Sequence, residues 1–184
     1  FRNFLEIAAQ SNGKIINYSK IARDTQSDPV SIQNYFEILE DTLVGFFLKP
    51  FHQSIRKRQR HNPKFYFFDT GVSRAASRHL SVPLLPGTYG YGNAFEHFLI
   101  TEIIRLSIYL KKDWEFFYLC TKDGAEIDLI IERPGMPLVL LEIKSSLRID
   151  DADLRSIIQL GRDFKNSKAF CFSQMAGCSS KNSK

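Results

Sequence analysis

Three charged residues interrupt apolar stretches in the second half of the chain: Asp128, Glu142 and Lys144. Residues 124–131 and 140–146 are rich in apolar and β-branched residues and flank a Pro-Gly pair. This pattern predicts two strands joined by a turn. Because side chains alternate between the faces of a strand, Glu142 and Lys144 share one face. A charge in such a strand is costly unless it is paired, solvated or bound to a metal.

Two carboxylates and a lysine on adjacent strands indicate a particular chemistry. Carboxylate oxygens suit Mg²⁺, which keeps several waters in its coordination shell. The metal lowers the pKa of a bound water and stabilises charge on a phosphoryl oxygen, and a lysine can orient that water or stabilise the transition state. The set therefore suits phosphodiester hydrolysis. In the alternative interpretation, Asp128, Glu142 and Lys144 form a satisfied ion pair between strands, with no catalytic role.

A further carboxylate lies on a predicted long helix, residues 92–112, for which Asn93 is a plausible cap. Glu96 falls on the apolar face of this helix, because Leu99, Ile100 and Ile103 follow it at helical spacing. It is therefore a candidate fourth member of the constellation. A structural salt bridge, or a hydrogen bond to a loop, is the alternative role.

Composition limits the possible classes of protein. The chain has 184 residues, 43% of them hydrophobic, and 16 are Phe, enough for one medium domain or two small ones. It contains no apolar run of about 18 residues and no signal peptide, so we expect a cytoplasmic protein. The three cysteines lack metal-ligand spacing, which favours a reducing compartment. Because the first residue is Phe, we expect further sequence upstream.

The first part of the chain, residues 1–68, predicts a winged helix-turn-helix. Helices are expected at 1–11 and 18–24, with Asn17 as the cap of the second, and a third follows Ser27 or Asp28 and runs to about Leu43. Apolar strands at 44–51 and 64–68 would form the wing. The third helix would present Gln33, Asn34 and Tyr35 to a DNA major groove, or serve only as packing.

The segment between the two wing strands has the strongest local charge asymmetry, with basic residues and no acid. Basic tips neutralise the phosphate backbone without reading sequence, so the segment is a candidate DNA contact. The net charge of +5 is compatible with a polyanionic partner. A solvated loop and a protein-contact patch are the alternatives. The candidate contacts are Arg56, Lys57, Arg58 and Arg60.

Residues 69–184 predict a second domain. Asp69 is expected to cap a short helix at 72–80, and residues 81–92 are the clearest linker. The order that follows is helix, three strands, helix and strand, which predicts an α/β fold with helices packed on a mixed sheet. A helix at 152–164 is expected to be capped by Asp150 or Asp151. The polar tail from about residue 177 is expected to be disordered.

These motifs resemble the PD-(D/E)XK, or restriction-endonuclease-like, superfamily. Asp128 matches its first acid, Glu142-Ile143-Lys144 its acid-x-Lys element, and Glu96 its helix glutamate. The fold class implied is an N-terminal winged helix-turn-helix followed by a restriction-endonuclease-like α/β domain with a mixed central sheet. The resemblance implies catalytic roles for Asp128, Glu142, Lys144 and Glu96. It also implies Mg²⁺ held by Asp128, Glu142 and Glu96, and DNA as the partner.

The wider chain is similar to a C-terminal domain of unknown function that follows an AAA+ ATPase module in many prokaryotic proteins. The similarity rests on the motifs Asp69-Thr70-Gly71, Gly92–Glu96, Gly124–Asp128 and Glu142–Ser146. No Gly-x-x-x-x-Gly-Lys-Ser/Thr phosphate loop occurs in the chain, so an ATPase domain, as partner, is expected upstream. The resemblance therefore implies either a nuclease-like, DNA-binding region or a catalytically inactive DNA-binding or protein-interaction module that serves the ATPase.

Overall fold

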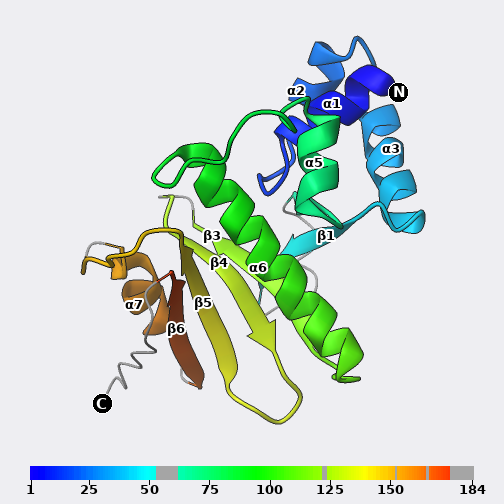
Figure 1. Ribbon diagram of the computed structural model, residues 1–184. Coiled ribbons are helices and arrows are strands. Elements are labelled where there is room, and N and C mark those ends of the chain that lie inside the picture. Colours follow the sequence, from blue (N-terminus) through cyan, green and yellow to red (C-terminus); the bar gives the residue numbers. More distant parts are fainter. Residues whose placement is uncertain (53–61, 122–123, 152, 165, 175–184) are drawn as a thin grey trace. The chain divides into compact units, whose positions relative to one another are not determined.

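The computed structural model describes residues 1–52, 62–121, 124–151, 153–164 and 166–174 (Figure 1). The chain divides into two compact units, the first within residues 1–49 and 54–83, and the second formed by residues 84 onward together with the segment around Phe51. The basic candidates Arg56, Lys57, Arg58 and Arg60 and the predicted disordered tail lie outside the described residues. No helix in the described part of the chain is long and apolar enough to cross a membrane.

Unit 1 begins with the helices α1 (Arg2–Gln10), α2 (Tyr18–Asp24) and α3 (Pro29–Asp41). Side-chain caps fix two of these starts, as the sequence predicted. Asn17 accepts the Lys20 N–H at 2.9 Å, and Asp28 accepts the Ser31 N–H at 2.9 Å, with Pro29 in the first turn of α3. The strands β1 (Gly45–Pro50) and β2 (Lys64–Phe67) then pair antiparallel. This part is compatible with the predicted winged helix.

Aromatic side chains fill the core of unit 1. Phe36 lies within 5.0 Å of both Phe4 and Phe65, measured between ring centroids, so α1, α3 and β2 meet around one ring. The helix α5 (Thr70–Ala76), capped by Asp69, contacts α1 and β2 and so belongs to this unit, which continues past residue 68, where the sequence placed a boundary. The buried apolar residues of this cluster are Phe4, Ala8, Ala9, Ile16, Ile21, Ala22, Ile32, Phe36, Leu39, Phe65 and Phe67.

Two expectations for α3 were wrong. Leu43 is exposed with a φ of +60°, because the helix ends at Asp41 and the chain turns toward β1. Tyr35 does not point outward. Its ring packs against Phe1 and Phe4 at centroid distances of 5.5 and 5.2 Å. Gln33 and Asn34 are exposed, as predicted.

Unit 2 contains α6 (Tyr89–Tyr109), β3 (Glu115–Cys120), β4 (Glu126–Glu132), β5 (Leu138–Lys144), α7 (Arg155–Gly161) and β6 (Ser167–Ser173). Its strands lie in the order β3-β4-β5-β6; the first three are antiparallel and β6 runs parallel to β5. This confirms the predicted α/β class with a mixed sheet. The helix α6 contacts β5, and α7 contacts β4, β5 and β6 (Figure 1).

Both helices of unit 2 differ from the prediction at their starts. Thr88, not Asn93, caps α6 by accepting the Tyr91 N–H at 3.3 Å, so Gly90 and Gly92 lie inside the helix rather than in the preceding loop. The helix α7 starts only at Arg155 and has no side-chain cap, whereas Asp150 or Asp151 was expected to begin it. The sequence prediction started α6 too late because glycines suggested a loop, and it started α7 too early because acidic residues in a turn suggested a cap.

Gly45 allows the close approach of β1 and β2. A Cβ atom there would lie 2.3 Å from the Phe65 Cζ and 2.6 Å from the Tyr66 backbone oxygen. We predict that Gly45→Ala destabilises unit 1 by about 1–3 kcal/mol, because the backbone oxygen cannot move aside. Thermal and urea unfolding measure this. The control is Gly90→Ala, where nothing lies within 4 Å and alanine favours the helix, so stability is unchanged or raised. Equal stability of wild type and Gly45→Ala would contradict the close packing.

Candidate functional site

The end of β5 carries an ion pair. The Lys144 Nζ lies 2.8 Å from the Glu142 Oε1, and the two side chains retain 32% and 7% of their exposure, respectively. They project from the same face because they are two residues apart on a strand. β5 is an inner strand, paired with β4 on one side and β6 on the other, which explains why Glu142 is buried. The structure therefore brings together the predicted acid and lysine of the Glu-x-Lys motif.

The second carboxylate oxygen of Glu142 is in an unusual position. Its Oε2 is buried and has no hydrogen-bond partner within the described part of the chain. A buried acceptor without a partner costs more than an ordinary hydrogen bond contributes, and more still when it is charged. An acceptor of this kind is a position where a bound cation or a donor from a ligand would lower the free energy of the folded chain.

Asp128 lies next to this pair on β4. The β4–β5 register pairs Leu129 with Leu141 and Ile130 with Leu140, and its continuation places Asp128 opposite Glu142. At that point the Asp128 Oδ2 accepts the Ile143 N–H at 2.7 Å. A side-chain acceptor thus replaces a backbone one at the end of the ladder. This bond holds the Asp128 carboxylate beside the end of β5.

Electrostatics link these residues to further carboxylates. Burial raises the pKa of Glu142 above its ordinary value; Lys144 opposes this, and the negative charges of Glu126 and Glu96 add to it. Glu96 therefore lies within electrostatic reach of Glu142, as the sequence predicted. Glu126 was not among the predicted site residues, although its position two residues before Asp128 puts it on the same face of β4.

The lysine is held in its charged form. Burial lowers the pKa of Lys144, but Glu142, Asp128 and Asp153 more than offset this, and the pKa is raised. Asp153 was missed by the sequence interpretation, because it lies in the turn before α7 and no periodicity connects it to β5. An ammonium group among several carboxylates remains protonated at every physiological pH.

Cys171 lies opposite Glu142 in the parallel β5–β6 register. Burial and the negative charge of Glu142 raise the pKa of its thiol to about 11. A thiol with a raised pKa is a poor nucleophile and a poor metal ligand, since both roles need the thiolate. Cys171 therefore lies beside the site as an uncharged thiol and takes no part in its chemistry.

The residues fit a divalent cation in charge and donor type. The negative charges of Glu126 and Glu96 act on Glu142, and those of Glu142, Asp128 and Asp153 act on the Lys144 ammonium. The carboxylates therefore outnumber the cation, and a bound cation would relieve their mutual repulsion. The unpartnered Glu142 Oε2 provides a hard oxygen donor. Among the described residues, however, no three His, Cys, Asp or Glu side chains stand close enough to hold an ion. The predicted ligands Glu96, Asp128 and Glu142 are thus not preassembled, and Mg²⁺ would need waters or substrate oxygens to complete its shell.

The candidate nucleic-acid residues that the structure describes lie on α3. Gln33 and Asn34 are exposed, and the Gln33 Nε2 donates to the Glu37 Oε1 at 2.9 Å, one turn along the helix. A surface amide bond of this kind exchanges readily with a ligand or with water. These two residues remain available on the face that the sequence predicted.

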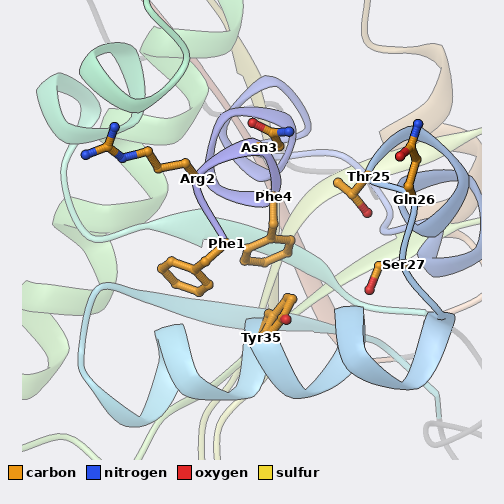
Figure 2. Close-up of a pocket in the computed structure, with 8 residues that line it drawn as sticks. All are labelled: Phe1, Arg2, Asn3, Phe4, Thr25, Gln26, Ser27 and Tyr35. Atoms are coloured by element: carbon orange, nitrogen blue, oxygen red, sulfur yellow. The ribbon is translucent and has the colours of Figure 1, made fainter.

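Unit 1 also contains a hollow of about 380 Å³ (Figure 2). The rings of Phe1, Phe4 and Tyr35 lie together, and polar residues come from the start of α1 and from the turn after α2. None of the predicted carboxylate-site residues lines it, and of the three predicted groove-facing residues only Tyr35 does. Its lining residues are Phe1, Arg2, Asn3, Phe4, Thr25, Gln26, Ser27 and Tyr35.

Comparison with known proteins finds two domain families. Residues 1–81 match a family described as a domain of unknown function (DUF8612), and residues 91–179 match a second one (DUF4143). The interval between them falls in the linker that the sequence predicted at 81–92. Two relatives, the uncharacterized protein Mb2031c of Mycobacterium bovis and the uncharacterized protein Rv2008c of Mycobacterium tuberculosis, are each 29% identical over 129 residues. The match covers 70% of this chain but only 28% of each relative's length. No solved structure matches the chain.

The raised pKa of Glu142 predicts how stability depends on pH. A carboxyl group with a raised folded-state pKa stabilises the fold when protonated, and this contribution is lost as pH rises from its ordinary value of 4.5 through the folded pKa. We therefore predict that Glu142→Gln is at least as stable as wild type at pH 7, and that its advantage disappears below about pH 4. Thermal unfolding followed by circular dichroism across this pH range measures the effect.

Glu115→Gln, an exposed carboxylate on β3, is the matched control and should show no such pH-dependent gain. A Glu142→Gln variant that is clearly less stable than wild type at pH 7 would contradict the prediction. That result would mean that the ion pair with Lys144 outweighs the cost of burying the charge.

Proposed function

We propose that the chain is the C-terminal region of an AAA+ family ATPase and that its second unit is a Mg²⁺-dependent, nuclease-like hydrolase of DNA phosphodiesters. The observation that carries the proposal is the buried Glu142, with an unpartnered Oε2, beside Lys144 and opposite Asp128. A buried charge that costs stability is typical of a functional site. The motifs that resemble the PD-(D/E)XK superfamily fall on these same residues.

Mg²⁺ would be held by Glu142 and Asp128, with Glu96 as the further candidate ligand. When bound, it would supply Lewis-acid stabilisation of the charge that develops on phosphoryl oxygens. This role agrees with the hard oxygen donors of the set and with the repulsion among its carboxylates.

The chain's own residues have separate tasks in this proposal. The Lys144 ammonium, one-third exposed and held charged by its acidic neighbours, can leave Glu142 for a phosphate oxygen and stabilise the transition state. Asp128 is positioned by the Ile143 N–H, so its carboxylate keeps one orientation as substrate binds. Glu126 and Glu96 add negative charge near Glu142. When no substrate is present, this charge favours the binding of a cation over the binding of an anion.

Unit 1 would hold the nucleic acid. Gln33 and Asn34 are exposed on α3, the helix expected to enter a groove, and the basic residues Arg56, Lys57 and Arg58 would contact phosphates. The net charge of +5 favours association with a polyanion. We propose a cytoplasmic location for this activity.

A catalytically inactive module is the second candidate. The direct contact between Lys144 and Glu142, and the lack of a three-residue metal group in the described part of the chain, favour it. In that case the charges would be a structural remnant, and the chain would bind DNA or a protein on behalf of the upstream ATPase.

The test is cleavage of DNA by the full chain with Mg²⁺ or Mn²⁺. We predict cleavage by wild type and a loss of about 100-fold or more in rate for Asp128→Asn, Glu142→Gln and Lys144→Met, since each removes a charge that acts on the transition state. The matched control is Lys168→Met, an exposed lysine on the neighbouring strand β6, which should keep the wild-type rate.

Cleavage that persists in all three variants would exclude this site. Salt-dependent DNA binding without cleavage by wild type would support the inactive module. A chain that neither binds nor cleaves DNA would contradict the hydrolase proposal and the DNA-binding form of the second candidate, and would leave only its protein-binding form.

A further inference from the structure

The long helix α6 exposes aromatic side chains on a face other than the one that packs in unit 2. His97, Ile100 and Thr101 are buried on the packed side. On the other side, Phe98 is 52% exposed and Tyr109 is 81% exposed. The exposed aromatic rings therefore indicate an interaction surface.

Four residues form a continuous seam along this face. Glu102, Arg105 and Tyr109 are the fourth, seventh and eleventh residues after Phe98, the spacing that keeps side chains on the contact stripe of paired helices. The two ends of the seam are aromatic and its middle is charged. The Arg105 Nη1 lies 2.7 Å from the Glu102 Oε1, and both side chains are partly exposed.

The seam is complementary to itself in one direction only. In an antiparallel pair centred between residues 103 and 104, Phe98 of one copy faces Tyr109 of the other, and Glu102 faces Arg105. In a parallel pair in register, Glu102 would face Glu102 and Arg105 would face Arg105. Both arrangements are compatible with a two-fold axis, but only the antiparallel one places opposite charges together, and there each contact occurs twice.

We propose that two copies of this chain pair through an antiparallel contact between their α6 helices, with Phe98, Glu102, Arg105 and Tyr109 as the interface. The aromatic rings of one copy cover those of the other, and the charged pairs form a ring of alternating sign at the centre. This proposal is independent of the hydrolase activity, because the seam contains none of the residues of the carboxylate site.

The area that the seam can bury limits the affinity of the dimer. One helix from each copy provides an interface near the lower limit of about 1,200 Å² for specific contacts. We therefore expect a concentration-dependent equilibrium between monomer and dimer rather than a permanent dimer. Exposed ion pairs contribute little by themselves, so the central charges mainly determine register and direction.

Sedimentation velocity of the full chain over a concentration series tests the proposal. Glu102→Arg places like positive charges across the seam, and Arg105→Glu places like negative charges there. Each variant alone is expected to dimerise at least tenfold more weakly than wild type. An equimolar mixture of the two is expected to recover dimers, because every new arginine then faces a glutamate. The intrachain contact between residues 102 and 105 cannot explain such a recovery, because each variant chain still carries two like charges at these positions.

The aromatic end has a matched pair of variants. Tyr109→Asp should weaken the dimer, whereas Ile108→Asp should leave it unchanged, because Ile108, 68% exposed, lies about 100° around the helix from Tyr109. Circular dichroism confirms that each variant is folded. A chain that is monomeric at every concentration overturns the proposal. A dimer that tolerates both charge reversals, or a mixture that does not recover, overturns it equally.

Discussion

A carboxylate buried in an inner strand, with a single cation beside it, is the interaction on which the second unit depends. Glu142 is surrounded by β4 and β6, so its charge cannot be solvated directly. Its partner Lys144 comes from the last residue of the same strand, where the side chain still reaches solvent. Burying an ion pair in this way costs more than packing apolar residues of the same size. The strand therefore keeps its charges at a cost to stability.

The surrounding elements are arranged about the end of that strand. Asp128 replaces a missing backbone acceptor by binding the Ile143 N–H, which keeps β4 and β5 together where the ladder stops. The start of α6 lies at the same end. Gly92 lies against Ser145, where a Cβ would come 3.4 Å from the serine Oγ. Gln174, just after β6, donates from its Nε2 to the Tyr91 hydroxyl.

These contacts explain how a helix residue comes to act on a strand residue. Because the start of α6 is tied to the ends of β5 and β6, Glu96, about one turn further along, remains within electrostatic reach of Glu142. The lysine, the unpartnered oxygen and the acidic neighbours form one electrostatic unit. The excess of negative charge in this unit favours binding of a cation, and its lysine favours binding of an anion. The unit is therefore suited to binding a cation and a phosphate group together.

Local patterns predicted much of this arrangement. Apolar runs on either side of a Pro-Gly turn identified the two strands that carry Asp128 and Glu142. The cap at Asn17 was correct, and so was Asp28, one of the two caps offered for α3, because these signals depend on neighbouring residues alone. The start of α6 was missed, since Gly90 and Gly92 read as loop residues. Contacts between residues far apart in the sequence could not be predicted either. The pairing of Cys171 with Glu142 depends on the register of distant strands, which periodicity does not define.

The most direct test of the account is a crystal of the chain soaked in Mn²⁺ and measured at the manganese absorption edge. If the site depends on a cation, we expect an anomalous peak between Glu142 and Asp128, with the ion on the Glu142 Oε2 and Lys144 moved away from the carboxylate. A crystal that shows no anomalous peak at this position, with Lys144 still bound to Glu142, would contradict a cation-dependent site.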